Sequence, residues 1–293
     1  MLNSPRFTVI IPTYNRPIYT RIAIDSVLVQ SFMNYEIIIT DDSTNEEIFN
    51  LVKDLNEPKI KYYKNERRLG IAENVKKAIL YSTGSYIAIL NDDDFWHPEW
   101  LESVSKKIEY DNNLDLVFCD HWLVDINGQC LYPETEKNTI TYLRSELDTS
   151  IDFSHACNLY INNTVPIAVG SVFRKSILDL NDFPNEIGGA YDRWIMMNIL
   201  SKTKSVIYYI PTRLTYYRIH SSSVTSTQRT NTIIWLEYVM NKSIGRFKNT
   251  ECNQKIISLH RNILKTLTKA LFLDRNYFKA IVIFYKYILS IKN

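Results

Sequence analysis

Glycine is scarce in this chain, which has 7 glycines among its 293 residues, against 20 tyrosines. The sequence contains neither GxGxxG nor GxxxxGKS/T, so it lacks the glycine-rich loops that hold phosphates in many proteins. It also lacks an uninterrupted run of about 18 apolar residues, the length that a membrane-spanning helix needs. A strand-like segment begins already at Phe7, so we expect no signal peptide and a cytoplasmic protein.

A strong net charge and clustered cysteines are also missing. The formal net charge is +2, which provides no broad basic surface, so we expect no nucleic-acid partner. The four cysteines, Cys119, Cys130, Cys157 and Cys252, show no CxxC spacing and no zinc-type pairing with histidine. We therefore expect no structural zinc, and scattered buried thiols in a reducing compartment.

The composition itself is that of an ordinary globular protein, 45% hydrophobic and 23% charged. Up to about residue 120, apolar β-branched runs alternate with segments that repeat apolar residues at helical spacing. They predict strands at 7–12, 35–40, 60–64, 86–90 and 114–119, and helices at 17–31, 45–55, 71–82 and 98–110. Repeated βα units of this length predict an α/β fold with a mostly parallel central sheet and helices on both faces.

The pattern changes after about residue 120. A hairpin that turns at Asn127-Gly128 is predicted for 122–132, and the segment 133–160 is polar and irregular. The remaining predicted elements are strands at 168–173, 206–210 and 214–219, helices at 175–180 and 190–202, and helical structure from 230 onward. We expect one large domain over residues 1–225 and a helical C-terminal extension over 226–293.

An acidic block ends the strand predicted at 86–90. There the apolar run passes into three consecutive carboxylates, Asp92, Asp93 and Asp94. Like charges crowded at a strand end stay ionised only when something offsets them, and a divalent cation is the obvious candidate. The space beyond the carboxyl ends of parallel strands is also where such sheets bind ligands. The alternative is a solvated acidic turn before a helix that begins near Pro98.

Three other predicted strands end in polar residues, at Pro12–Pro17, Thr40–Ser43 and Tyr217–His220. The carboxyl ends of parallel strands lie at one edge of a sheet, so the first two endings should meet the acidic block in one crevice. Each ending alone is weak evidence for a site, since Asp and Asn often end strands as turn formers. Their coincidence predicts a functional site.

In combination these motifs resemble glycosyltransferase family 2, whose fold is the GT-A nucleotide-sugar-binding fold. The resemblance covers roughly residues 6–221, about three quarters of the chain. It rests on the segments Val9–Arg16, Glu36–Ser43, Asn65–Asn74, Asn91–Pro98 and Tyr191-Asp192. The stretch Asp41–Glu47 is also similar to the spore-coat glycosyltransferase of bacilli. The resemblance implies that residues 1–225 form a GT-A catalytic domain.

The resemblance implies a divalent cation, Mn²⁺ or Mg²⁺, bound to the diphosphate of a sugar nucleotide. The DxD motif of the family falls on Asn91-Asp92-Asp93, so an asparagine replaces its first acid. Asp93 is expected to ligate the metal, with Asp92 near the ribose. His220 is expected to be a further metal or diphosphate contact; the alternative for a lone histidine is a satisfied polar residue.

The resemblance also implies the contacts to the nucleotide. Asp41 is expected to accept a hydrogen bond from the imide N–H of uracil or thymine, and a strand-terminal Asx turn is its alternative role. Thr13 and Tyr14 would flank the base, and Arg68 would pair with the base edge or phosphates unless it is a solvated surface residue. The expected nucleotide-sugar contacts are Pro12, Thr13, Tyr14, Asn15, Asp41, Arg68, Asn91 and Asp92.

Asp192 is the expected catalytic residue. In inverting members of the family, the matching acid is the general base that takes the proton of the acceptor hydroxyl as its oxygen attacks the anomeric carbon. An Asp in the first turn of a helix is also favoured by the helix dipole, which limits what the position proves. Tyr191 stands where the family more commonly has an acid.

These expectations together describe an inverting, metal-dependent glycosyltransferase. It would move a sugar from a UDP- or dTDP-sugar to a hydroxyl of a carbohydrate or glycolipid acceptor, in the synthesis of a surface polysaccharide or glycoconjugate. The alternatives are a nucleotidyltransferase and a non-catalytic nucleotide- or carbohydrate-binding relative. Against the nucleotidyltransferase, the loop Pro12–Pro17 is not the glycine-rich basic loop expected after its first strand.

The end of the chain is basic and amphipathic. Asp274 is the only acid after His260, among seven lysines and arginines. Such a segment lies on an anionic membrane surface, packs on the catalytic domain or forms a dimer contact. We favour packing or a homodimer contact, since core-facing amphipathic helices are commoner; peripheral contact with the inner face of the membrane is the alternative.

Overall fold

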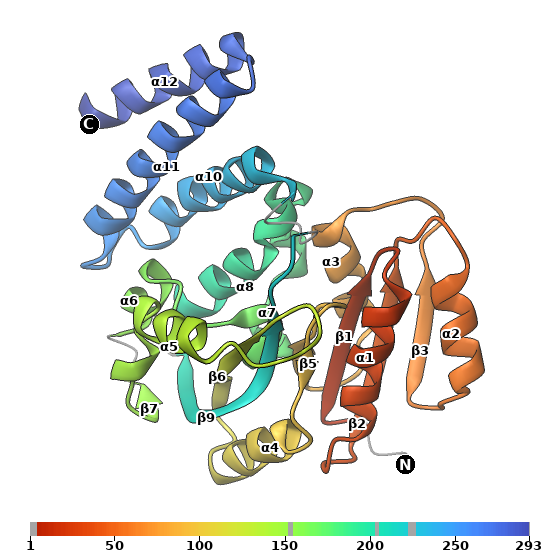
Figure 1. Cartoon of the computed structure of the whole chain (residues 1–293). Helices are drawn as coiled ribbons and strands as arrows, with labels where there is room; N and C mark the ends of the chain where they lie inside the picture. The colour runs from red at the N-terminus through yellow and green to blue at the C-terminus, as the bar shows by residue number, and fades with distance from the viewer. Residues whose placement is uncertain (1–4, 152–154, 203–204, 222–226, 293) are drawn as a thin grey trace.

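A nine-stranded mixed sheet lies at the centre of the computed structural model, which describes residues 5–151, 155–202, 205–221 and 227–292 (Figure 1). The first part of the chain forms β1 (Phe7–Thr13), α1 (Pro17–Leu28), β2 (Tyr35–Asp41), α2 (Glu47–Leu55), β3 (Ile60–Lys64), α3 (Ile71–Tyr81) and β4 (Tyr86–Ile89). The middle forms β5 (Phe95–Trp96), α4 (Trp100–Tyr110), β6 (Leu114–Val124), α5 (Tyr132–Thr141), β7 (Ser150–Ile151) and α6 (Ala156–Ile161). The last part forms α7 (Ile167–Gly170), β8 (Ser171–Arg174), α8 (Tyr191–Leu200), β9 (Val206–Arg218), α10 (Arg229–Arg246), α11 (Asn253–Leu273) and α12 (Tyr277–Lys292).

The strand order is β3-β2-β1-β4-β8-β6-β9-β5, and β7 pairs with β9. β1 is parallel to β2 and β4, and β2 is parallel to β3. β8 runs antiparallel to β4 and β6, and β5 runs antiparallel to β9. The predicted α/β fold is confirmed, and the carboxyl ends of β1, β2 and β4 meet at one edge of the sheet as expected.

Alternation along the strands divides the apolar core into two layers. Ile10 and Ile38 face the layer that α3, α8 and α10 complete. Val9 and Ile11, on the opposite face of β1, belong to the layer that α1 and α4 complete. Because both faces are covered, every residue of β1 and β2 is buried. This explains why these strands read as continuous apolar runs rather than as alternating ones.

The middle of the chain differs from the prediction. The segment 133–160, predicted to be irregular, contains α5 and α6. α5 begins with Pro133 in its first turn, which suits a helix start, but its buried residues are Thr135 and Thr139, so no apolar periodicity marks it. The predicted strand at 168–173 begins as the short helix α7, because an apolar run of this length fits either structure.

The strands predicted at 206–210 and 214–219 are one continuous strand, β9. The residues between them, around Pro211, are exposed, which breaks the apolar pattern without ending the strand. β6 extends through Trp122 to Val124, and the predicted hairpin is observed around its turn at Asn127-Gly128: Val124 forms an antiparallel bridge with Cys130, and the Leu131 N–H donates to the Leu123 carbonyl at 2.8 Å. In that turn Gly128 has a φ of 84° and donates its N–H to the carbonyl of Asp125 at 3.0 Å.

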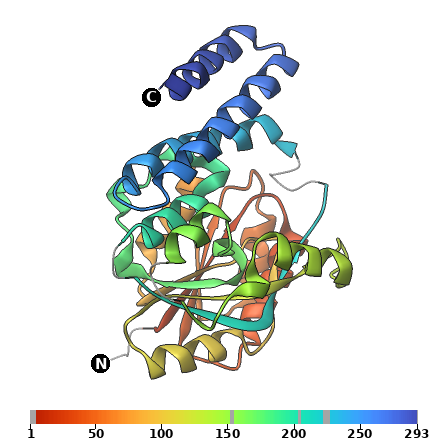
Figure 2. The ribbon, with the colours of Figure 1, turned by 90° about the vertical axis from the view of Figure 1, so that its left-hand side faces the viewer.

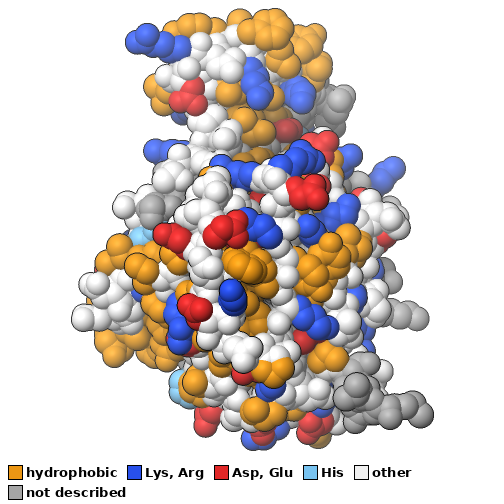
Figure 3. Space-filling view, turned by 90° about the vertical axis from the view of Figure 1, so that its right-hand side faces the viewer, with side chains coloured by type: hydrophobic (Ala, Val, Ile, Leu, Met, Phe, Trp, Pro, Cys, Tyr) orange, Lys and Arg blue, Asp and Glu red, His pale blue; other side chains and the backbone are white. Residues whose placement is uncertain are grey.

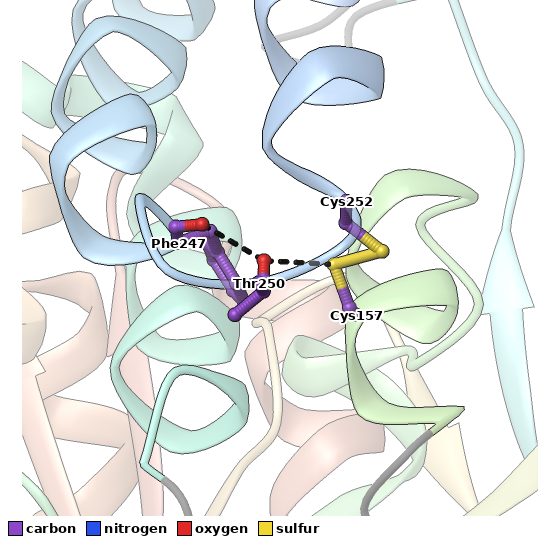
Figure 4. The surroundings of a disulfide bond; sticks show 4 residues. All are labelled: Cys157, Phe247, Thr250 and Cys252. Atoms are coloured by element: carbon purple, nitrogen blue, oxygen red, sulfur yellow. Dashed lines mark hydrogen bonds between the residues drawn. A yellow bond between two sulfur atoms is a disulfide. The ribbon is translucent and has the colours of Figure 1, made fainter.

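Cys157 of α6 and Cys252, just before α11, form a disulfide (Figure 4). The expectation of four separate thiols is therefore corrected; Cys119 and Cys130 are the free ones. Sequence spacing did not reveal this pair because 95 positions separate its members. The bond joins the helical C-terminal region to the body of the protein, next to Thr250, whose hydroxyl donates to the Phe247 carbonyl at 2.8 Å.

From α10 to α12, the C-terminal helices pack less and less on the body of the protein. α10 packs on the sheet layer through Val239 and Met240, and Ile256 near the start of α11 still belongs to that layer. The rest of α11 and α12 form a helical hairpin that projects from the body (Figures 1 and 2). It has its own small apolar cluster, which includes Leu264 and Ile283. Of the helices in the described part of the chain, none has the length and apolar character needed to cross a membrane.

Candidate active site

A cavity of about 750 Å³ lies at the carboxyl edge of β1 and β4. The loop after β1 supplies Pro12, Thr13, Tyr14 and Arg16, the loop after β2 supplies Asp42, and the loop before α3 supplies Arg68 to Gly70. The acidic block and the start of α8 complete this half, with Asn91 to Asp94, Tyr191 and Asp192. The predicted convergence of strand endings is therefore observed, and it follows from the parallel order of these strands.

An internal cation offsets the charge of the acidic block. Arg16 Nη1 lies 2.6 Å from Asp93 Oδ2 and 3.3 Å from Asp92 Oδ1. His220 Nε2 lies 3.0 Å from the same Asp93 oxygen. Burial, together with the neighbouring charge of Asp93, raises the pKa of Asp92 to about 7 in spite of Arg16. The block is thus crowded enough that its carboxylates compete for positive charge.

Asp94 differs from its two neighbours. It is fully buried, and its Oδ1 accepts a hydrogen bond from the backbone N–H of Arg218 at 2.9 Å. Burial and then the charge of Asp93 raise its pKa well above the usual range, and its Oδ2 has no hydrogen-bond partner among the described residues. Asp94 therefore connects the end of β9 to the acidic block through this hydrogen bond.

The structure separates the adjacent acids Asp41 and Asp42. Asp41, expected to contact the base, is fully buried and accepts hydrogen bonds from Tyr62 Oη at 2.6 Å and the backbone N–H of Ser43 at 2.7 Å. Of the two, Asp42 lines the cavity and Asp41 does not. The hydrogen bond from the Ser43 N–H to Asp41 Oδ1 is that of a strand-terminal Asx turn, the alternative role considered for Asp41.

Asp42 organises the loop that precedes α3. Its Oδ1 accepts hydrogen bonds from Asn65 Nδ2 at 2.7 Å and from the backbone N–H of Leu69 at 3.1 Å, and its Oδ2 accepts from the N–H of Gly70 at 2.8 Å. Gly70 has a φ of 82°, a conformation that favours glycine. This arrangement holds the loop, and Arg68 within it, against the cavity.

Tyr14 and Arg68 form one wall of the cavity. The Arg68 guanidinium lies 4.0 Å from the centre of the Tyr14 ring, in cation–π contact. The Tyr14 backbone N–H donates to Asp92 Oδ2 at 3.2 Å. Asn15 has a φ of 52° and ties this loop to the one after β2, since its N–H donates to Ser43 Oγ at 2.8 Å. Asn15 shapes the rim without lining the cavity itself.

Tyr191 and Asp192 begin α8 opposite the acidic block. Tyr191 Oη donates a hydrogen bond to Asn91 Oδ1 at 2.7 Å, so the two positions that depart from the family pattern touch each other. Asp192 lines the cavity, and its Oδ1 accepts from the backbone N–H of Arg193 at 2.6 Å. Burial raises the pKa of Asp192, which strengthens its carboxylate as a proton acceptor.

The residues fit a divalent cation shared with a bound phosphate. No group of three or more His, Cys, Asp or Glu among the described residues could hold a metal without other ligands. Asp93 nevertheless lines the cavity, and His220 Nε2 lies 3.0 Å from its Oδ2. Mg²⁺ and similar ions are commonly held by one or two carboxylates together with substrate phosphates, so a pair of protein ligands is sufficient.

The far half of the cavity was not predicted. It is lined by polar residues from the middle of the chain, His121, Asn138, Tyr142, Arg144 and Asn163. Arg144 is held by Asp120, whose Oδ1 accepts from its Nε at 2.5 Å. His121 Nδ1 is buried and has no hydrogen-bond partner among the described residues. Residues 133–160 had no helical signal, so nothing in the sequence placed this group beside the acidic block.

The sequence model described as "Glycosyl transferase family 2" matches residues 8–180. An uncharacterized glycosyltransferase of Rickettsia prowazekii is 29% identical over 230 residues, which are 76% of this chain and 67% of that protein.

Two solved structures share the fold at low sequence identity. S. aureus TarS 1–349 in complex with UDP-GlcNAc is 18% identical, with a TM-score of 0.65 over 88% of this chain and 71% of that one. The mannosyltransferase PcManGT from Pyrobaculum calidifontis, in complex with GDP-Man and Mn²⁺, is 17% identical, with a TM-score of 0.64 over 97% of this chain and 80% of that one. The longer TarS chain extends well beyond the match, which spans 43% of it.

Proposed function

The chain belongs to glycosyl transferase family 2, and we propose that it transfers a sugar from a UDP- or dTDP-sugar to a hydroxyl of a carbohydrate or glycolipid acceptor. The observation that carries this proposal is the meeting of three groups in one cavity. They are the Tyr14–Arg68 wall, the acidic pair Asp92 and Asp93, and Asp192 on the opposite side. In this proposal the Tyr14–Arg68 wall contacts the nucleotide, the acidic pair lies on the side of the diphosphate, and Asp192 serves the acceptor hydroxyl.

The donor half suits a pyrimidine nucleotide. In this proposal Asp42, which lines the cavity wall, takes the place of Asp41 and accepts the hydrogen bond from the imide N–H of uracil or thymine. Tyr14 offers a ring face to the base, with Arg68 on that ring and able to move to a phosphate. Pro12 and Thr13 form the adjacent floor, and Asp92 takes the ribose side. The neighbour TarS, solved with UDP-GlcNAc, supports this assignment.

Asp93 and His220 would hold Mn²⁺ or Mg²⁺ together with the donor diphosphate. When bound, the cation neutralises the charge that develops on the departing nucleoside diphosphate. Arg16, now 2.6 Å from Asp93, is the cation that must share this carboxylate with the metal. The presence of Mn²⁺ in the PcManGT complex supports the proposal. In this proposal Asn91, which accepts a hydrogen bond from Tyr191 Oη, lies beside the ribose.

Asp192 acts as the general base in this proposal. Its carboxylate takes the proton of the acceptor hydroxyl while that oxygen forms a bond to the anomeric carbon from the face opposite the nucleotide. The bond from the anomeric carbon to the diphosphate oxygen breaks, and the nucleoside diphosphate leaves with the electron pair. This displacement inverts the anomeric configuration. Because burial raises the pKa of Asp192, its carboxylate can hold the proton transiently.

The acceptor would enter from the far half of the cavity. His121, Asn138, Tyr142 and Asn163 present donors and acceptors there, which match the hydroxyls of a carbohydrate. The acceptor classes proposed from the sequence, a surface polysaccharide or a glycoconjugate, present such hydroxyls. In this proposal residues 1–225 carry the catalytic groups, and Gln228, Thr232 and Trp235, at the start of the helical C-terminal region, line the same cavity.

A thermal-shift comparison of UDP, dTDP, GDP and CDP, each with and without Mn²⁺, tests the donor assignment. A ligand at 100 times its dissociation constant stabilises the folded state by about 2.7 kcal/mol, which such a measurement resolves. UDP or dTDP should stabilise the protein most, and Mn²⁺ should increase the shift. A larger shift with GDP than with UDP would contradict the role of Asp42.

A further inference from the structure

The hairpin of α11 and α12 carries an exposed apolar surface that sugar transfer does not require. Its most exposed side chains are Leu273 and Phe278, at 81% and 82%, and Ile281 and Tyr285 continue it along α12. Figure 3 shows hydrophobic and basic side chains gathered on this projecting lobe, at the top of the view. We call Leu273, Phe278, Ile281 and Tyr285 the hairpin surface.

The hairpin surface is not the face by which α12 packs on the protein. Ala280 and Ile283 are buried against Leu264 and Leu267 of α11. Phe278, Ile281 and Tyr285 follow one another at spacings of three and four residues, which places them together on another face of the helix. In the described residues this second apolar face has no protein partner that buries it.

Charge identifies the kind of partner that suits this surface. Beyond His260 the chain has seven lysines and arginines and one acid, Asp274. Lys279 and Lys286 are exposed on α12 itself, beside the apolar face. An apolar helix face with basic side chains along it complements the surface of an anionic lipid bilayer, whose phosphates attract the lysines while the aromatic rings enter the interface.

A second copy of the chain complements this surface poorly. In a two-fold dimer the same patch faces itself, so the excess of positive charge on one hairpin would meet an equal excess on the other. A bilayer of anionic lipids has the opposite charge. This comparison reverses the preference for a dimer contact that the sequence alone suggested.

We propose that the α11–α12 hairpin docks on the surface of an anionic lipid bilayer, with Phe278, Ile281 and Tyr285 facing the acyl region. α12 has 16 residues, which as a helix span about 24 Å, less than the hydrocarbon core of a bilayer. It therefore lies in the plane of the interface instead of crossing it. This surface is separate from the catalytic cavity, so the proposal stands or falls independently of the proposed reaction.

Co-sedimentation of the full chain with vesicles tests this proposal. Vesicles of phosphatidylglycerol and phosphatidylcholine should carry the protein into the pellet, and vesicles of phosphatidylcholine alone should not. Each basic residue near an anionic surface contributes about fivefold in partitioning, so Lys279→Gln with Lys286→Gln should weaken binding by about 25-fold. Phe278→Ser should weaken it by at least tenfold, on the order of the loss of one inserted aromatic ring.

Matched variants on the catalytic domain serve as controls. Tyr110→Ser removes an aromatic side chain that is 93% exposed on α4, and Lys53→Gln with Lys106→Gln removes one exposed charge from α2 and one from α4. These variants should bind vesicles as the unmodified protein does. All variants should keep the thermal shift with UDP, which shows that the fold and the donor site are intact.

Two results would overturn the proposal. One is equal binding, or none, on anionic and neutral vesicles. The other is a stable dimer in solution that Phe278→Ser converts to a monomer, without binding of either form to anionic vesicles, because the surface would then be a dimer contact. Light scattering after size-exclusion chromatography distinguishes the two forms.

Discussion

Tyr191 Oη donates a hydrogen bond to Asn91 Oδ1 across 2.7 Å, joining the first residue of α8 to the second residue after the end of β4. Both positions more commonly carry an acid in the family that the sequence resembles. Two carboxylates at this distance would have to share a proton, whereas a phenol and an amide form a neutral pair. The two departures from the family pattern are therefore one paired feature, which limits negative charge beside Asp92 and Asp93.

Removal of the Tyr191 hydroxyl should weaken both the fold and the reaction. Tyr191→Phe keeps the ring but leaves the Asn91 oxygen without its donor, at a cost of about 1–2 kcal/mol in the free energy of unfolding. The turnover number should fall more than the affinity for the donor, because Asp192 is the next residue. Tyr110→Phe, at an exposed position, is the control for urea denaturation. Equal stability and turnover of Tyr191→Phe and the unmodified protein would show that the pair has no such role.

Restoration of an acid at position 91 should make the protein depend on metal for stability. Asn91→Asp adds a carboxylate beside Asp92, whose pKa is already raised to about 7. Without metal the variant should lose about 1 kcal/mol or more in the free energy of unfolding, on the scale of one unit in a carboxyl pKa. Mn²⁺ should restore most of this loss, and should stabilise the variant more than it stabilises the unmodified protein. A variant that is equally stable with and without Mn²⁺ would contradict the metal assignment.

Substitution of Asp41 and of Asp42 should differ in its effect on donor binding. Asp42→Asn removes the carboxylate at the cavity wall, and UDP affinity measured by calorimetry should fall by about tenfold or more, the value of a hydrogen bond to a charged group. Asp41→Asn should leave UDP affinity within about threefold while it destabilises the fold, since Tyr62 and Lys64 lose a buried anion. The opposite pattern would return the base contact to Asp41.

His121 should make the protein less stable in acid. Burial, and then the positive charge of Arg144, lowers the pKa of His121 to about 3 from its usual 6.5. The unfolded chain therefore binds a proton between these values and the folded protein does not, so the free energy of unfolding falls as the pH falls from 6.5 towards 3. The slope from this residue is at most about 1.4 kcal/mol per pH unit. In urea denaturation His121→Gln should flatten this dependence, and His97→Gln, a half-buried histidine outside the cavity, should retain it.

The sequence alone was sufficient to predict the strands that are buried on both faces and the helices that bury one regular apolar stripe. The strands at 7–13, 35–41 and 86–89 and the helix at 71–81 were predicted to within a few residues because their apolar patterns are long and regular. Their parallel order then placed the acidic block beside Tyr14. What could not be predicted depends on tertiary contacts. Asp41 is the last residue of β2 and is held by Tyr62 and Lys64, whereas Asp42 lines the cavity, and the sequence alone does not distinguish these two adjacent acids.

The far wall of the cavity was hidden for a different reason. α5 has a polar sequence and buries threonines, so its helix forms through packing and not through a hydrophobic stripe. Arg144 and His121 line the cavity from different segments of the chain, and Asp120 Oδ1 accepts a hydrogen bond from Arg144 Nε. The bond between Tyr191 and Asn91 is equally invisible, since 100 positions separate the two residues. His121 belongs to the proposed acceptor half of the cavity and Asn91 to its donor half, and only the fold brings them together.

Release of nucleoside diphosphate from UDP-sugars in the presence of Mn²⁺ tests the central claim most directly, when the unmodified protein is compared with Asp192→Asn. The unmodified protein should turn over at least one UDP-sugar. In the variant the turnover number should fall by about 10²–10⁴, the contribution of a general base, while the thermal shift with UDP and Mn²⁺ stays unchanged. Undiminished turnover by Asp192→Asn would contradict the catalytic assignment on which this account of the cavity rests.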